Sequence, residues 1–188
     1  MGWIVLLIVV VIVAAVAWFV MAGFNRLRRA DIGAQEALGG IDVQLTRRAD
    51  LIPNLVETVK GYAAHEKGVF EEVTRARAGV AKAAKEGSVP EKAKAAAALD
   101  HAIFNVMAVA ENYPQLQAST NFMQLQEQLG TTEDQLAFAR QYYNDKTRGL
   151  NELVMTVPWM LLTGIANVHQ REFYEAPEGQ EAPPQVRF

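Results

Sequence analysis

The sequence of 188 residues contains no cysteine. This absence excludes disulfide bonds, thiol catalysis and every zinc site that needs sulfur ligands. Histidine is scarce as well, because His65, His101 and His169 are the three present and they lie far apart in the sequence. Basic residues are not in excess: the formal net charge is −3, so the composition gives no reason to expect nucleic acid as a partner.

Motifs that carry catalysis are also missing. There is no glycine-rich phosphate loop and no Gly-x-Ser-x-Gly elbow. His65-Glu66 begins like the helix of a zinc protease, but the second histidine four residues later is absent. The Glu-x-x-His pairs of a di-iron helical bundle do not occur either. We therefore expect no enzyme, with no catalytic residue, no cofactor and no metal site.

Charge is absent from the N-terminal region, because no charged side chain precedes Arg26. Residues 3–24 are apolar apart from Gly23, and a helix of this length spans roughly 33 Å, against about 30 Å for the hydrocarbon core of a bilayer. A cleaved signal peptide would need a basic start and a shorter apolar run, and a buried core helix would need a larger protein around it. The segment 3–24 is therefore predicted to be a single transmembrane helix.

Positive charge follows this segment directly, at Arg26, Arg28 and Arg29. The positive-inside rule then places the following domain in the cytoplasm and sends the N-terminus outward. The opposite orientation stays open, since this short cluster is the main signal.

Apolar residues after the anchor recur every three or four positions, which is typical of helices, and no segment alternates long enough to need a sheet. The first stripe, at Leu27, Ala34, Leu38, Ile41 and Leu45, continues from the transmembrane segment without an intervening proline, although Gly39-Gly40 weakens it. We expect a boundary at Pro53, with Asp50 as the N-cap of a new helix whose stripe runs from Ile52 toward Lys85.

A turn with Ser88 as its cap is predicted at 86–91, and the next helix should end near Pro114. A seven-residue repeat then predicts one continuous helix through Gly130, ended or kinked by Pro158. The repeat is formed by Phe122, Leu129, Leu136, Tyr143, Leu150 and Val157. A short piece follows at 159–168. Residues 175–188, rich in proline and glutamate, have the composition of a disordered tail. The predicted fold is all-α: an antiparallel bundle of three to four long helices after one transmembrane helix.

The block IDVQLTRRADLIPNLVETVKGY at residues 41–62 strongly resembles the LemA family. Further residues fit the same family in order: Glu111-Asn112-Tyr113-Pro114, Asn121-Phe122, Ala139-Arg140-Gln141-Tyr142-Tyr143-Asn144-Asp145, Asn151 and Pro158. The resemblance implies a bacterial protein with an N-terminal membrane anchor and a helical-bundle domain at 25–174, with no established enzymatic activity. Thr46 departs from the lysine that the family often has there, and Gly39-Gly40 is looser than usual.

Polar residues crowd two parts of this family-like block, and they form our candidate interaction surface. Its members are Arg47, Arg48, Asp50, Asn54, Lys60, Arg140, Asn144 and Asp145. In a structural interpretation, Asp50 and Asn54 satisfy backbone groups around Pro53, and the arginines pair with Asp145 or Glu133 across helices. In a functional interpretation, the residues recognise a partner or another copy of the protein.

Two functions follow from these expectations. The first is a non-enzymatic scaffold or interaction protein of the bacterial cell envelope, anchored by one helix in the inner membrane. It would associate with itself and with the lipid bilayer, and it could organise the membrane or bind other envelope membrane proteins. The alternative is a sensory or adaptor module that signals through its anchor, by phosphotransfer on a bundle histidine such as His65.

Overall fold

The computed structural model describes residues 1–175, and through these residues the chain is helical with no strand. The predicted all-α fold is confirmed. Apart from Glu175, the tail predicted at 175–188 lies outside the described residues. The elements are α1 Gly2–Lys60, α2 Lys67–Glu86, α3 Val89–Ala110, α4 Pro114–Gln117, α5 Thr120–Met155, the 3-10 helix η1 Trp159–Leu162 and α6 Thr163–Ala166.

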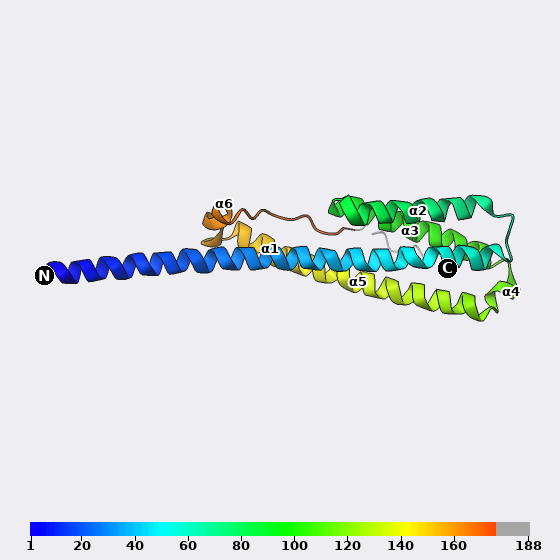
Figure 1. Cartoon of the computed structure of the whole chain (residues 1–188), viewed down its shortest axis with the longest axis horizontal. Coiled ribbons are helices and arrows are strands. Elements are labelled where there is room, and N and C mark those ends of the chain that lie inside the picture. Colours follow the sequence, from blue (N-terminus) through cyan, green and yellow to red (C-terminus); the bar gives the residue numbers. More distant parts are fainter. Residues whose placement is uncertain (176–188) are drawn as a thin grey trace, which may run out of the picture. The chain divides into compact units, whose positions relative to one another are not determined.

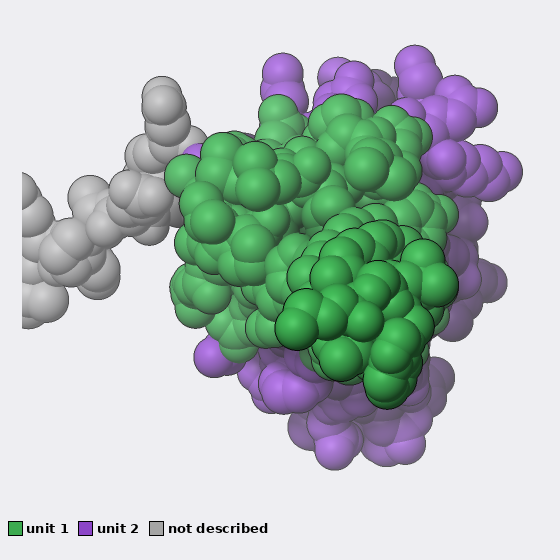
Figure 2. All heavy atoms as spheres, turned by 90° about the vertical axis from the view of Figure 1, so that its left-hand side faces the viewer, with its two compact units in different colours: residues 1–37, 143–173 green, residues 38–142, 174–188 purple. Residues whose placement is uncertain are grey.

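The chain forms two compact units, which Figure 2 colours separately. Unit 1 comprises residues 1–37 and 143–173, and unit 2 comprises residues 38–142 together with the chain from Tyr174 onward. Helices α1 and α5 each contribute residues to both units. We describe the units one at a time.

Unit 2 is an antiparallel bundle made by the C-terminal part of α1, by α2 and α3, and by the N-terminal part of α5 (Figure 1). Short turns join successive helices, so their directions alternate, as in an up-down-up-down bundle. The stripes read from the sequence form its core. Among its fully buried side chains are Ile41, Leu45, Ile52, Leu55, Val59, Val73, Val80, Leu99, Val106 and Leu136.

The helix boundary predicted at Pro53, with Asp50 as its N-cap, is wrong. Helix α1 continues to Lys60 with Pro53 inside it. Proline has no N–H, so the carbonyl of Ala49, four residues earlier, loses its helical partner. Arg77 on α2 replaces that partner: its Nε donates a hydrogen bond to the Ala49 carbonyl oxygen at 3.1 Å. A long-range contact that no local pattern reveals therefore keeps the helix intact.

The break occurs later, at residues 61–66, where a continuous helix toward Lys85 was expected. The backbone N–H groups of Tyr62 and Ala63 both bond to the Val59 carbonyl, at 3.0 and 2.9 Å, and these bonds close the end of α1. Glu66 is the residue that precedes α2. A turn at this point lets α2 pack back against α1, with Lys60 Nζ 5.4 Å from the Phe70 ring centroid.

Two other local predictions are confirmed. Ser88 precedes α3 and its N–H donates to Glu91 Oε2 at 2.7 Å, which is the backbone half of a capping box. Helix α5 runs through Gly130, as the seven-residue repeat predicts. The repeat ends one step early, because α5 stops at Met155 and Val157 is 73% exposed.

Unit 1 combines the N-terminal part of α1 with the C-terminal end of α5, η1, α6 and the segment that follows. Residues 2–19 of α1 are exposed throughout. Beyond them a small core forms from Leu27, Ala34, Leu150, Leu162, Ala166 and Val168. Gly23 leaves room for this packing, because a Cβ placed there would lie 2.3 Å from Leu162 Cδ1 and 3.0 Å from Trp159 Cζ3.

After α6 the chain returns as an extended segment held to α5 by hydrogen bonds. The Asn151 side chain donates to the Arg171 carbonyl and accepts from the Arg171 N–H, both at 2.9 Å. The Tyr143 hydroxyl donates to the Glu172 carbonyl at 2.8 Å. Tyr143 and Asn151 lie two helical turns apart, so they face the same segment. Both residues carry the family resemblance, and here they have a structural role.

Helices α1 and α3 are, by length and composition, apolar enough to cross a membrane. The two helices differ in hydropathy and burial. The most apolar 18-residue stretch of α1 has mean hydropathy 3.3 and none of it is buried, whereas that of α3 has mean hydropathy 1.2 and is 39% buried. Lys92 and Asp100 of α3 also form ion pairs inside unit 2. We therefore treat α1 as the membrane helix and α3 as part of the bundle.

The Arg77 hydrogen bond predicts a non-additive pair of substitutions. Arg77→Met should lower the free energy of unfolding by about 1–3 kcal/mol, because the Ala49 carbonyl is left without a partner. In a Pro53→Ala background the same substitution should cost clearly less, because an alanine at this position restores the helical N–H. Urea titrations of the detergent-solubilised full chain, followed by circular dichroism, measure this difference. Arg75→Met is the matched control on the exposed face of α2, and strict additivity would contradict the assignment.

Candidate functional site

Arg48 is the centre of the candidate surface, but it points into the bundle. It lies on the buried stripe of α1 with Ile41, Leu45 and Ile52, and it is 7% exposed. Its Nη1 forms ion pairs with both Asp100 of α3 and Glu133 of α5. One guanidinium thus joins three helices, and the two carboxylates compensate a charge that would be costly to bury alone.

Arg140 completes this cluster from α5. Its Nη1 lies 3.9 Å from Glu133 Oε1, and its guanidinium lies 5.3 Å from the centroid of the Tyr174 ring. The cluster holds two cations and two carboxylates, Arg48 and Arg140 with Asp100 and Glu133, so its charges are balanced within unit 2. Of the two partners expected for the arginines, Glu133 is confirmed, whereas Asp145 pairs with Arg148 at 3.2 Å.

Burial alters the protonation of this cluster. Desolvation raises the pKa of Asp100 above its ordinary value of 3.8, although Arg48 and Arg140 act in the opposite direction and Glu133 adds to the rise. Burial also raises the pKa of the Tyr174 hydroxyl, against the lowering effect of Arg140. Burying the Asp100 carboxyl and the Tyr174 hydroxyl therefore costs desolvation free energy, which the neighbouring arginines partly offset.

A second buried ion pair escaped the sequence analysis. Lys92 of α3 is 4% exposed, its Nζ lies 2.5 Å from Asp42 Oδ1, and it also donates to the Ala84 carbonyl at 3.0 Å. A signal for it exists in the sequence: Lys92 lies four residues before Ala96 and seven before Leu99, on the apolar stripe of its helix. Arg48 occupies an equivalent position on the stripe of α1, so a charge on a stripe marks both pairs.

The remaining candidates lie nearer the surface. Arg47 donates to Gln135 Oε1 at 3.2 Å, and Asp50 Oδ1 lies 4.0 Å from Arg77 Nη2. Asn54 is exposed and borders a polar depression with Gln124. Asn144 and Asp145 belong to unit 1, whereas the other six candidates belong to unit 2. The eight residues are therefore not one cluster, and a binding role for the exposed ones stays a prediction.

The sequence profile of the LemA family matches residues 37–188. The chain belongs to the LemA family. Two of its relatives are named magnetosome proteins. It is 25% identical to magnetosome protein MamQ of Magnetospirillum gryphiswaldense, over 78% of this chain and 62% of that protein. It is 24% identical to magnetosome protein MamQ 2 of Paramagnetospirillum magneticum, over 92% of this chain and 71% of that protein.

The match therefore spans less than two thirds of the length of the first of these relatives. The family and its named relatives are not described as enzymes, and together with the exposed apolar part of α1 they indicate a membrane-associated protein.

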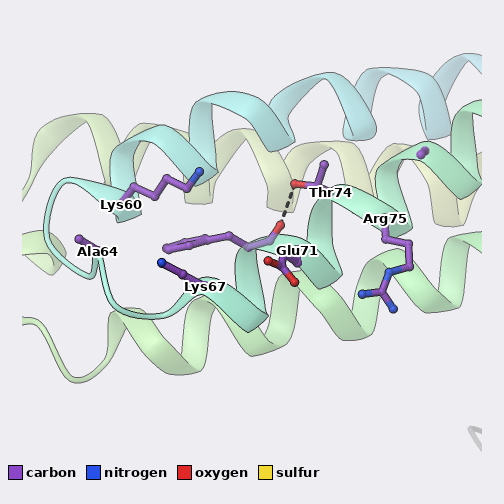
Figure 3. A pocket seen from close by; sticks show the side chains of 8 residues that line it. Lys60, Ala64, Lys67, Glu71, Thr74 and Arg75 are labelled. Atoms are coloured by element: carbon purple, nitrogen blue, oxygen red, sulfur yellow. Dashed lines mark hydrogen bonds between the residues drawn. The ribbon is translucent and has the colours of Figure 1, made fainter.

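Several pockets in the described part of this LemA-family chain are open to solvent. One of about 670 Å³ lies beside the α1–α2 turn and is lined by Lys60, Lys67, Glu71 and Arg75 among others (Figure 3). Its charged side chains come from both helices, and Thr74 is occupied by a hydrogen bond to the Phe70 carbonyl at 2.7 Å. Nothing in this arrangement resembles a catalytic constellation.

The histidines of the described chain do not form a metal site. Between residues 1 and 175 no three His, Asp or Glu side chains are arranged to hold a metal ion. His65 is exposed in the α1–α2 turn. His101 Nδ1 lies 3.2 Å from Glu72 Oε1, which also accepts a hydrogen bond from Asn105 at 3.3 Å.

Removal of the Arg48 charge tests the buried cluster. Arg48→Met should lower the free energy of unfolding by about 3–5 kcal/mol, because Asp100 and Glu133 would remain close together without their shared cation. Arg47→Met, one residue along on the exposed face, should cost about 0–1 kcal/mol. Urea titrations of the full chain in detergent compare the two.

The same variant should respond to pH. The pKa of Asp100 is already raised in the folded state, and removal of Arg48 takes away an influence that lowers it. A carboxyl whose folded pKa is raised favours the folded state while it is protonated, and this advantage is lost as the pH rises from 3.8 through the raised pKa. The deficit of Arg48→Met should therefore shrink in acid. A deficit that is independent of pH would contradict the repulsion between Asp100 and Glu133.

Proposed function

We propose that this protein is a non-enzymatic scaffold of the bacterial inner membrane that associates with itself through its helical bundle. The observation that carries the proposal is the continuity of α1. One helix, Gly2–Lys60, contains both the exposed apolar stretch and one of the four helices of the bundle. A chain built in this way holds its bundle at the membrane and confines copies to two dimensions, which raises their effective concentration.

The orientation follows from charge. Arg26, Arg28 and Arg29 lie directly after the apolar stretch, and this basic cluster supports an orientation with unit 2 in the cytoplasm and the N-terminus outside. Asp31 lies 3.8 Å from Arg28 and 2.9 Å from Arg171, so its carboxylate is engaged with arginines. Acidic residues have little influence on membrane topology, so Asp31 does not offset the orienting effect of the three arginines.

The surface most suited to self-association is aromatic rather than charged. Two of the charged candidates, Arg48 and Arg140, are balanced by Asp100 and Glu133 inside the bundle. By contrast, Phe138 of α5 is 71% exposed and stacks on Tyr142, with ring centroids 6.4 Å apart. Phe104 of α3 is 69% exposed. Large exposed aromatic side chains are enriched at the centres of protein–protein interfaces.

The partners of the scaffold are the bilayer, a second copy of the chain and other envelope membrane proteins. A role of the exposed candidates Arg47, Asp50, Asn54 and Lys60 in contacts with these partners stays a prediction. Signalling by phosphotransfer on His65 stays the alternative. Apart from the exposure of His65 in its turn, no observation favours it.

Self-association through α5 is tested by a charge placed on its exposed aromatic residue. Phe138→Glu should abolish most of the crosslinking between copies in membranes, because a carboxylate would have to be buried in the contact. Gln124→Glu adds the same charge to the same helix, about four turns away, and should crosslink like the unaltered protein. A lysine-reactive crosslinker on intact membranes, read by gel, measures both. Equal crosslinking of the two variants, or none in the unaltered protein, would contradict the proposal.

A further inference from the structure

The segment after α5 exposes apolar side chains at high density. Residues 155–165, named here the apolar turn, contain no charged residue. Five of its apolar side chains are exposed: Met155 63%, Val157 73%, Met160 44%, Leu161 72% and Ile165 67%. A water-facing turn rarely presents so many large apolar groups without a partner. The end of α5 together with η1 and α6 also has the length and hydropathy of a broken or re-entrant span, bent by 86°.

The apolar turn is fixed against the membrane helix within unit 1. Trp159 stacks on Phe19, with ring centroids 5.6 Å apart, and the Arg26 guanidinium lies 5.0 Å from the Trp159 ring. Leu162 is buried in the space that Gly23 leaves open. These contacts hold the turn against α1 while the five apolar side chains stay exposed.

The contact with α1 also sets the depth of the turn. Phe19 lies five residues before the end of the apolar stretch 3–24, which corresponds to roughly 8 Å along a helix. With residues 3–24 spanning a bilayer, a tryptophan held between Phe19 and Arg26 would lie at the boundary between hydrocarbon and headgroups, the layer where tryptophan is enriched.

We propose that the apolar turn enters the bilayer at the interface where α1 leaves it, near Phe19 and Arg26. The protein would then contact lipid through two elements. Met155, Val157, Met160, Leu161 and Ile165 would bury their side chains at the boundary between headgroups and acyl chains. The inference rests on the proposed membrane anchoring of α1 and adds to it a second, shallow contact. Such a contact would also restrict rotation of α1 about its own axis in the membrane.

Lipid is a better occupant for this surface than a second copy of the chain. Trp159 and Leu162 pack the turn directly against the membrane helix. A docking face for a protein would be expected to carry a polar rim. The run from Leu153 to Val168 has no charged side chain that could supply one.

Because the chain has no cysteine, single cysteines can report the position of each residue. Leu161→Cys and Ile165→Cys are labelled with an environment-sensitive fluorophore in the full-length protein, reconstituted into phosphatidylcholine–phosphatidylglycerol vesicles. Val9→Cys lies inside the anchor, six residues after its start, and Gln124→Cys marks the bundle surface. We expect the labels at 161 and 165 to lose most of their emission to nitroxide-labelled lipids and to resist aqueous iodide, with a shallower depth than the label at 9.

The possible results distinguish failure of the second lipid contact from failure of the α1 anchor. If the label at 9 is quenched by lipid while those at 161 and 165 are quenched by iodide like that at 124, the anchor stands and the second contact is overturned. If the labels at 161 and 165 are shielded from iodide but not quenched by lipid, and the shielding disappears at a low protein-to-lipid ratio, a second copy covers the turn and the inference is also overturned. If the label at 9 is itself accessible to iodide, the anchoring fails.

Discussion

A polypeptide in hydrocarbon has no water to satisfy its backbone, so its carbonyl and N–H groups must bond to one another. In a bilayer, that constraint would hold residues 3–24 of α1 as a helix despite their many valines and isoleucines, which are mediocre helix formers in water. The same helix then continues to Lys60 and becomes part of the bundle. At Pro53, where one backbone bond is lost, Arg77 supplies the missing donor. Within unit 2, the backbone hydrogen bonding of α1 therefore depends on this contact from α2.

Buried charge has the second organising role. Arg48 joins α1, α3 and α5 through Asp100 and Glu133, and Lys92 ties α3 to α1 through Asp42. Buried ion pairs contribute little net stability in general, but they penalise any arrangement in which a charge loses its partner. In a bundle whose core consists mainly of interchangeable aliphatic side chains, these pairs specify which helices meet and in which register. The polar residues that carry the family resemblance are thus partly explained by folding, and the exposed aromatic residues become the better candidates for association.

The sequence predicts this fold well where the signal is local or periodic. The repeat from Phe122 to Leu150, the cap at Ser88 and the apolar stripe of α1 follow from spacing alone, and the structure confirms them. The failures share one cause, which is dependence on distant residues. Nothing near Pro53 reveals that Arg77 will bond to Ala49, so a break was expected there. Nothing near Gly23 reveals that Leu162 will fill the space above it, or that Asn151 will hold the backbone of Arg171. For the candidate surface, the pairing of arginine with Glu133 was predictable, whereas its separation into two units was not.

The claim that residues 3–24 stay in lipid as the start of the bundle's first helix is tested most directly by alkaline carbonate extraction of bacterial membranes. The intact chain, its N-terminal residues identified by mass spectrometry, should remain in the membrane pellet. Recovery of a soluble protein that lacks the first two dozen residues would contradict the account, because the helical bundle would then function without its anchor.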